Sequence, residues 1–392
     1  HLMFALLIVF LNNPADKKTN KPWMKALDIP IYAGIGFVLY YVIANTARLT
    51  SRVQYVSPVT LIDKIAMVVC IIILLEAVRR TLGTILFGFI LFFIVYFWFG
   101  KYFPSIFRFK GTNMQQFTEL MTMGSSGIYG TPLYTSASSL FYFMLFGVFF
   151  SECGGGQLLI DLGMKASKNG AGGPAKAAVI SSGLMGMISG SAVANVATTG
   201  VMTIPMMKKI GYEPEEAGAV EAVASTGGQI MPPIMGVGAF IMAEMLGVNY
   251  MKIAVAAIIP AIAYYFAVFV LVDRVAAKRA ANIDGTVDAS IRVDRKILPR
   301  LYLLLPAVLL VVWIIRGASL MRAGMIGIFA CIACNVINYF VNKEDFIDLK
   351  GLGACCIDGA KQAASIAIPT AACGIIINVV TGQTSLATNL SN

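Results

Sequence analysis

Charged residues are scarce in this chain of 392 residues: they make up 13% of it, whereas 58% is hydrophobic. A soluble globular protein carries about 25% charged residues. The shortage excludes a secreted domain, a disordered chain and a soluble Rossmann-type enzyme. It indicates a membrane protein.

Histidine is almost absent, because the single one is His1 at the start of the chain. This excludes Ser-His-Asp and Cys-His catalysis and the metal sites that contain histidine. The seven cysteines lie mostly in apolar runs, where a thiol behaves as a small hydrophobe. Cys331 and Cys334 have redox or metal spacing, but no second pair accompanies them. We therefore expect neither a disulfide framework nor an enzyme of these kinds.

Long apolar segments dominate the sequence instead. Segments with few or no charges lie at residues 29–44, 65–75, 82–99 and 254–272. A helix needs roughly 20 mostly apolar residues to cross the hydrocarbon core of a bilayer. The sequence therefore predicts an all-α, polytopic membrane protein.

Positive charge is spread over short loops between these segments, and the net charge is +10. No basic face with interleaved aromatic residues is present, so the partner we expect is the lipid bilayer and not a nucleic acid. Six of the positive side chains lie in two such loops: Lys17, Lys18, Lys21, Lys25, Arg79 and Arg80. The positive-inside bias predicts that both loops are cytoplasmic.

Polar breaks divide the chain at residues 102–116 and 273–300. We predict four parts: a first block at 1–110, a second at 111–274, a polar linker at 275–300 and a last block at 301–392. The apolar run that ends at Leu11 is too short to span a membrane, and the last residues turn polar. Both termini are therefore expected to be truncated.

The first interrupted helix lies at residues 172–207. A helical run is broken by the small and hydroxyl residues of 189–195 and then resumes without a loop long enough to leave the membrane. Two half-length apolar pieces around such a tip indicate a re-entrant hairpin.

A second break follows at residues 225–229, with Pro232 and Pro233 close behind. Proline withholds an amide, so backbone carbonyls near the break must face protein, water or an ion. Glycine and proline also serve helix packing in membranes, but two breaks so close together favour a transporter over a packing role.

An internal repeat supports this interpretation. The motif N-V-x-T occurs at Asn195 and again at Asn378, on opposite sides of the polar linker. Such an arrangement is typical of the inverted repeats of secondary transporters.

Glu221 and Glu244 lie in otherwise apolar helical stretches. Carboxylates within the membrane are functional candidates, so coupling to a proton or a cation is one interpretation. Capping of a neighbouring helix or pairing with a lysine is the other. Glu221 precedes Ser225 by four residues, which places both on one helix face.

The residues of these breaks also carry a resemblance to a known family. The segments GGPAK at 172–176, SGSAVANVATTGVMTIPMMKKIGY at 189–212 and AGAVEAVASTGGQIMPPIMGVGAFIMAE at 217–244 closely resemble the membrane subunit of tripartite ATP-independent periplasmic (TRAP) transporters. In detail the chain is similar to the fused permease that works with a TAXI-type solute-binding protein. LLEAVRRTLG at 74–83 resembles the small-subunit portion, and residues 298–327 resemble the start of the second repeat.

The resemblance implies an elevator-type fold of the ion-transporter superfamily, with re-entrant hairpins, discontinuous helices and inverted repeats. Block 1–110 would be the small-subunit scaffold without its first helix, block 111–274 the first transport repeat, and block 301–392 the second repeat, truncated after a hairpin tip at 374–381. The implied activity is sodium-coupled symport of a small organic anion, of the dicarboxylate, glutamate or 2-oxoglutarate class. The implied location is the inner membrane of a bacterium or archaeon, with a periplasmic TAXI-type binding protein as partner and no cofactor besides the coupling sodium.

The resemblance also implies site residues. The first sodium site would be formed by Ser189, Ser191, Asn195, Ser225, Thr226, Gly227 and Gly228, shaped by Pro232 and Pro233. The partner site would be formed by Gly374, Asn378, Thr381 and Gly382. Neutral oxygens from carbonyls, hydroxyls and an amide suit sodium, and helix N-termini at the tips suit a substrate carboxylate.

Two other functions stay open at this point. A sodium/anion symporter of the same superfamily would use similar hairpins and work without a binding protein. A membrane-embedded transferase would need a catalytic constellation, and the one tight acidic cluster, at Glu213, Glu215 and Glu216, is explained by the start of a helix.

Overall fold

The computed structural model describes residues 1–14, 28–104, 107–124, 126–167, 172–280, 297–341, 346–381 and 384. All regular elements of this part of the chain are helices. The positive loop at Lys17–Lys25 and most of the polar linker lie outside the described residues. The described residues form two compact units, 1–138 with 360–392 and 139–359. These units differ from the blocks predicted from the sequence, since both sides of the polar linker belong to the second unit.

Six described helical segments are long and apolar enough to cross a membrane, which confirms the prediction of an all-α, polytopic membrane protein. They are Thr84–Tyr102, Thr131–Ala166, Tyr250–Lys278, Leu298–Ile315, Leu320–Val341 and Leu349–Thr381.

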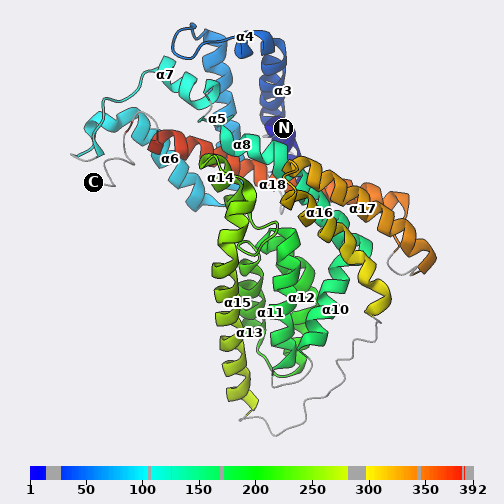
Figure 1. The fold of residues 1–392 in the computed structure, drawn as a ribbon. Helices are drawn as coiled ribbons and strands as arrows, with labels where there is room; N and C mark the ends of the chain where they lie inside the picture. Colours follow the sequence, from blue (N-terminus) through cyan, green and yellow to red (C-terminus); the bar gives the residue numbers. More distant parts are fainter. Residues whose placement is uncertain are drawn as a thin grey trace. The chain divides into compact units, whose positions relative to one another are not determined.

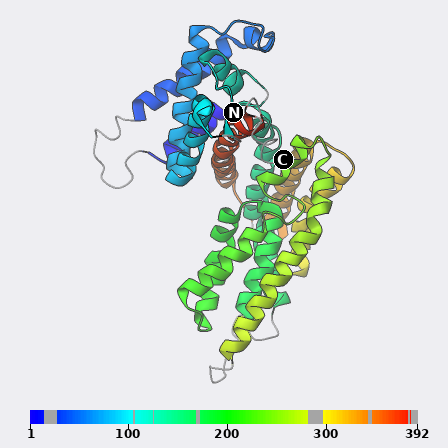
Figure 2. The same ribbon diagram turned by 90° about the vertical axis from the view of Figure 1, so that its left-hand side faces the viewer.

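The first unit is a bundle around α5 (Figures 1 and 2). Its helices are α1 (Leu2–Asn12), α3 (Asp28–Ala44), α4 (Thr46–Thr50), α5 (Leu61–Thr81), α6 (Thr84–Phe99), α7 (Met114–Thr118) and α8 (Thr131–Thr135), with short turns η1 (Gly100–Tyr102) and η3 (Glu119–Met123). The last part of α18 (Leu349–Thr381) packs into the same core. Arg80 joins three helices, because its guanidinium lies 2.8 Å from Asp28 and 4.9 Å from the ring centre of Phe10.

The second unit contains the segment in which the sequence predicts the breaks. Its elements before the linker are α9 (Phe141–Phe150), η5 (Ser151–Gly155), α10 (Gly156–Ala166), α11 (Gly173–Ser189), α12 (Ala192–Lys209), α13 (Pro214–Gly227), α14 (Val237–Met245) and α15 (Tyr250–Ala280). Those after it are η6 (Leu298–Leu304), α16 (Leu305–Ile315), α17 (Leu320–Val341) and the start of α18; η4 (Ser136–Leu140) lies at the border of the units. Helices α11, α12 and α13 pack on one another, and α15 lies along α11 and α13 (Figure 1).

Local chemistry sets the helix ends in this group. Helix α11 ends at Ser189 and is capped by Gly190, whose φ of 60° is left-handed and suits a residue without Cβ. Helix α12 begins after Ser191, whose hydroxyl accepts a hydrogen bond from the Ala194 amide at 3.3 Å. Glu213 and Glu216 form a capping box at the start of α13, in agreement with the helix-start interpretation of this acidic cluster.

Candidate functional site

The turn between α11 and α12 lies against the non-helical segment 228–236 that follows α13. The Ile234 amide donates to the Met187 carbonyl at 3.2 Å. A Cβ on Gly190 would lie 2.3 Å from the Met235 carbonyl oxygen. The structure therefore brings together the two breaks that the sequence predicts. The first break is shorter than the predicted 189–195, because only Gly190 and Ser191 are non-helical. The second break begins later than the predicted residue 225, because α13 continues through Gly227.

Two glycines allow α11 to approach the second break. A Cβ on Gly186 would lie 2.4 Å from the Cα of Gly228, and a Cβ on Gly228 would lie 2.6 Å from the Cα of Gly186. The same Cβ position on Gly186 would lie 3.2 Å from the side-chain nitrogen of Asn195. Asn195 and Gly228, both predicted site residues, are thus neighbours of Gly186.

Asn195 is fully buried at the start of α12. Its Nδ2 donates to the Ser182 carbonyl at 2.8 Å, while its Oδ1 has no hydrogen-bond partner among the described residues. A buried acceptor without a partner costs free energy, so such an oxygen in a hairpin needs a cation or a water to complete it. An amide oxygen is a suitable ligand for sodium.

Glu221 is also fully buried, on the face of α13 toward α11 and α12. The hydroxyls of Ser182 and Ser225 donate to its Oε1 at 2.7 and 3.1 Å. The Thr199 hydroxyl donates to the same oxygen and the Thr203 hydroxyl to Oε2. None of the ion pairs between described residues involves this carboxyl group. The lysine-pairing interpretation of Glu221 therefore finds no support.

Tyrosines of α15 cover several backbone carbonyls near the second break. Tyr264 donates to the Val223 carbonyl at 2.8 Å, and Tyr265 donates to the Ala224 carbonyl at 3.0 Å. Tyr250 donates to the Pro233 carbonyl at 2.9 Å. The sequence predicts that carbonyls near the break face protein, water or an ion, and these three face protein. The signal for this contact in the sequence is the presence of three tyrosines in the long apolar helix α15.

The remaining predicted residues of the first site have the following surroundings. Ser191 caps α12, and Ser225 donates to Glu221. Thr226 is exposed and donates to the Ala222 carbonyl at 2.7 Å. The Ser189 hydroxyl lies 3.5 Å from the Ser191 carbonyl. Among all predicted residues of the first site, the buried side-chain oxygen that lacks a hydrogen-bond partner in the described part of the chain is the Oδ1 of Asn195.

Pro232 and Pro233 are half-buried within the non-helical segment between α13 and α14. Gly227 lies against two tyrosine rings, since a Cβ there would lie 2.5 Å from Tyr264. Glu244 is exposed on α14, so the structure separates its surroundings from those of Glu221.

The second copy of the motif lies in the first unit. Asn378 is fully buried, its Nδ2 donates to the Leu120 carbonyl, and its Oδ1 has no hydrogen-bond partner among the described residues. Gly374 packs against the same segment, because a Cβ there would lie 2.2 Å from the Gly127 carbonyl oxygen. Thr381 is exposed and donates to the Ile377 carbonyl at 2.7 Å, and Gly382 lies outside the described residues.

The hairpin tip expected at 374–381 is not there. Helix α18 continues through Gly374 and Asn378 to Thr381. Gly374 has apolar neighbours on both sides and lies in helical backbone, whereas Gly190 has a left-handed φ and is followed by the capping residue Ser191. The shared motif therefore does not carry a shared backbone break.

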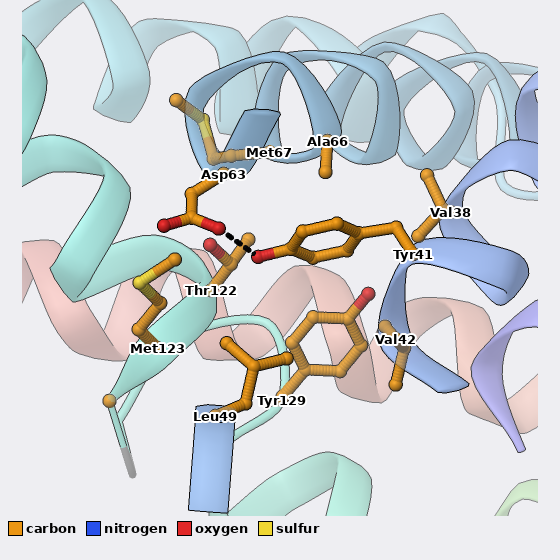
Figure 3. A pocket seen from close by; sticks show the side chains of 11 residues that line it. Val38, Tyr41, Val42, Leu49, Asp63, Ala66, Met67, Thr122, Met123 and Tyr129 are labelled. Carbon is orange, nitrogen blue, oxygen red and sulfur yellow. Dashed lines mark hydrogen bonds between the residues drawn. The ribbon is translucent and has the colours of Figure 1, made fainter. Parts of the chain in front are cut away.

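A separate cavity of about 210 Å³ lies within the first unit, between α3, α5 and residues 122–129 (Figure 3). Asp63 lies at its edge and accepts hydrogen bonds from Tyr41, from Arg48 at 3.1 Å and from the Thr60 amide at 2.9 Å. Burial raises the pKa of Asp63, but the hydrogen bonds from Arg48 and Tyr41 outweigh it and hold this pKa well below its usual value. The same bond raises the pKa of Arg48. This pair was not predicted from the sequence.

Comparisons with known proteins point to one family. A family model described as "Tripartite ATP-independent periplasmic transporter, DctM component" matches residues 69–392. A putative TRAP transporter large permease protein of Haemophilus influenzae is 34% identical over 121 residues, which cover 31% of this chain and 28% of that protein. The uncharacterized protein y4mL of Sinorhizobium fredii matches with the same identity and coverage. The matched part thus spans little more than a quarter of these relatives. The family match covers most of the chain, and the chain belongs to the DctM family of TRAP transporter membrane components.

Proposed function

We propose that this chain is the permease of a sodium-coupled symporter for a small organic anion, of the dicarboxylate, glutamate or 2-oxoglutarate class. The observation that carries the proposal is the buried Oδ1 of Asn195, which has no hydrogen-bond partner among the described residues and lies where the hairpin turn meets the second break. Neutral oxygens at discontinuous helices are the usual ligands of a coupling sodium. The backbone oxygens that the α15 tyrosines leave uncovered would complete the site.

A second sodium site would include the Oδ1 of Asn378, which is also buried and without a partner among the described residues. The N-terminus of α12, at the hairpin turn, would face a carboxylate of the substrate, because the first amides of a helix attract anions. Coupling to a proton through Glu221 or Glu244 is the alternative to sodium coupling, and the pH-gradient arm of the test below distinguishes the two.

We propose that a periplasmic solute-binding protein delivers the anion, as membership of this family implies. We infer that this partner is of the TAXI type and that residues 1–110 act as a fused small-subunit scaffold. This inference rests on the resemblance of residues 74–83, 189–212 and 217–244 to fused permeases of that type.

The test uses the full-length protein that contains this chain, reconstituted in liposomes with its binding protein. Uptake of labelled succinate, glutamate and 2-oxoglutarate is measured with and without an inward sodium gradient. We expect uptake of one of these anions to require both sodium and the binding protein. Uptake without the binding protein would favour the independent sodium/anion symporter, and uptake driven only by a pH gradient would contradict sodium coupling.

A further inference from the structure

Glu221 has unusual surroundings for a carboxyl group. It is fully buried, and the four hydroxyls that contact it come from three helices: Ser182 on α11, Thr199 and Thr203 on α12, and Ser225 on α13 itself. Burial of a carboxyl group is costly unless hydrogen bonds compensate it, and here they come from every helix of the α11–α13 group. The carboxyl group therefore joins the hairpin to the broken helix.

Two of these hydroxyl residues also contact Asn195. The Ser182 hydroxyl donates to Glu221 at 2.7 Å, and the Ser182 carbonyl accepts from the Asn195 Nδ2 at 2.8 Å. The Thr199 hydroxyl contacts Glu221 and lies 2.8 Å from the Asn195 carbonyl oxygen. It also lies 3.0 Å from the Ser182 hydroxyl. Glu221 and Asn195 are thus linked through the same two residues.

The link determines which way the Asn195 amide faces. A carbonyl can only accept a hydrogen bond, so the Ser182 carbonyl requires Nδ2 on its side and turns Oδ1 away from it. That oxygen is the buried one without a hydrogen-bond partner among the described residues. A shift of α11 relative to α12 at Ser182 would move it, and the Glu221 carboxyl group opposes that shift.

We propose that Glu221 is a positioning residue for Asn195 and thereby sets the affinity of the transporter for sodium. It acts through Ser182 and Thr199 and does not itself touch the ion. This deepens the proposed sodium symport and rests on it. This positioning role differs from a role in coupling. It depends on the shape and the hydrogen bonds of the Glu221 side chain and not on the binding of a proton or an ion by the carboxyl group.

The test compares Glu221→Gln with Glu221→Ala in the full-length protein in liposomes with its binding protein. Glutamine can still accept from Ser182 and Thr199 through Oε1, and its amide nitrogen can donate to the Thr203 hydroxyl. Alanine can do neither. The readout is the half-saturating sodium concentration at saturating anion, measured together with the maximal rate.

We expect Glu221→Ala to raise half-saturating sodium by about tenfold or more, the effect of losing one buried hydrogen-bonded anchor, with a maximal rate within about threefold of wild type. Glu221→Gln should stay within about threefold of wild type on both measures. Thr203→Val is the matched control, since Thr203 contacts Oε2 and the Thr199 carbonyl but neither Ser182 nor Asn195. It should behave like Glu221→Gln.

If Glu221→Ala does not yield folded protein, Ser182→Ala removes the hydroxyl that links Glu221 to α11 and keeps the carbonyl that holds Asn195. It should raise half-saturating sodium by about threefold or more. Unchanged sodium dependence in Glu221→Ala, or in Ser182→Ala where that variant stands in, would overturn the proposal. The proposal would also be overturned if Glu221→Gln raised half-saturating sodium as much as Glu221→Ala does. The same holds if Thr203→Val raised it as much as Glu221→Ala does. Sodium-independent uptake by the wild-type protein would instead refute the proposed function, on which this proposal rests.

Discussion

Asn195 and Asn378 use their side chains in the same way. In each, Nδ2 donates to a backbone carbonyl of a neighbouring segment, and Oδ1 is buried without a hydrogen-bond partner among the described residues. The two copies of the motif N-V-x-T, one in each unit, thus share the hydrogen bonding of the asparagine amide, although the backbone around them differs. At the scale of single residues, the amide oxygen is the feature that a cation would complete.

Asn195→Ala removes that oxygen and leaves the hydrophobic surface that directs membrane insertion unchanged. We expect sodium-dependent uptake to be lost, while the amount of protein in the membrane stays the same. Asn249→Ala is the matched control, because Asn249 is an exposed asparagine that caps α15 through the Met251 amide. Normal uptake by Asn195→Ala would contradict the assigned site.

Asp63 yields a prediction on stability and pH. Asp63→Asn removes a carboxylate that Arg48 and Tyr41 hold, and we expect a loss of about 2 kcal/mol at neutral pH, limited by the partial exposure of Arg48. The folded-state pKa of Asp63 lies below its usual 3.8, so this stabilisation is present above that value. It is lost as the pH falls from there through the lowered pKa.

The measurement is thermal unfolding of the purified protein in detergent as a function of pH. The difference between wild type and Asp63→Asn should be constant from pH 8 to about 5 and shrink below about pH 4. Glu215→Gln, a change at an exposed carboxylate, should cost only a few tenths of a kcal/mol. A difference that grows on acidification would have the wrong sign for this mechanism.

At the scale of elements, glycines and tyrosines determine how the broken helix is held. Gly186 and Gly228 let two backbones meet, while Tyr250, Tyr264 and Tyr265 bond carbonyls near the break. A helix in hydrocarbon can be interrupted only where protein, water or an ion satisfies the freed groups. The tyrosine hydroxyls of α15 form hydrogen bonds with some of these groups.

Gly186→Ala would place a Cβ 2.4 Å from the Cα of Gly228, so α11 must move away from the break. We expect a loss of about 1–3 kcal/mol of stability and at least a tenfold rise in half-saturating sodium, measured by thermal unfolding and uptake. Gly218→Ala is the matched control, because that helical glycine has open space around its Cβ position. It should stabilise α13 by up to about 1 kcal/mol. Equal behaviour of the two variants would show that the close approach is not needed.

At the scale of the whole molecule, the family match and the six long apolar helical segments among the described residues indicate a multi-pass protein of the inner membrane. The resemblance to TRAP permeases that the break residues carry is confirmed by the match over 69–392. This match begins in α5, within the block expected to be a small-subunit scaffold, so that assignment stays a prediction. The TAXI-type partner and the sodium coupling stay predictions as well.

The sequence was sufficient to predict the helices, the membrane class, the family and the approximate positions of both breaks. The reason is that these features depend on local signals, namely the length of apolar segments and the positions of glycine, proline and capping residues. The shared face of Glu221 and Ser225 followed from helix periodicity and is confirmed by their hydrogen bond. The prediction of a hairpin tip at 374–381 is wrong, because a repeated motif does not determine whether the backbone breaks.

Only the tertiary structure decided which groups find partners. Ser182, Thr199 and Thr203 were absent from the predicted site, and they contact Glu221 because α11, α12 and α13 pack together. A hydroxyl donates to whichever acceptor lies within about 3 Å, and that distance depends on helix packing. The same packing covers carbonyls with the α15 tyrosines, and it leaves the side-chain oxygen of Asn195 without a partner in the part of the chain that the structure describes.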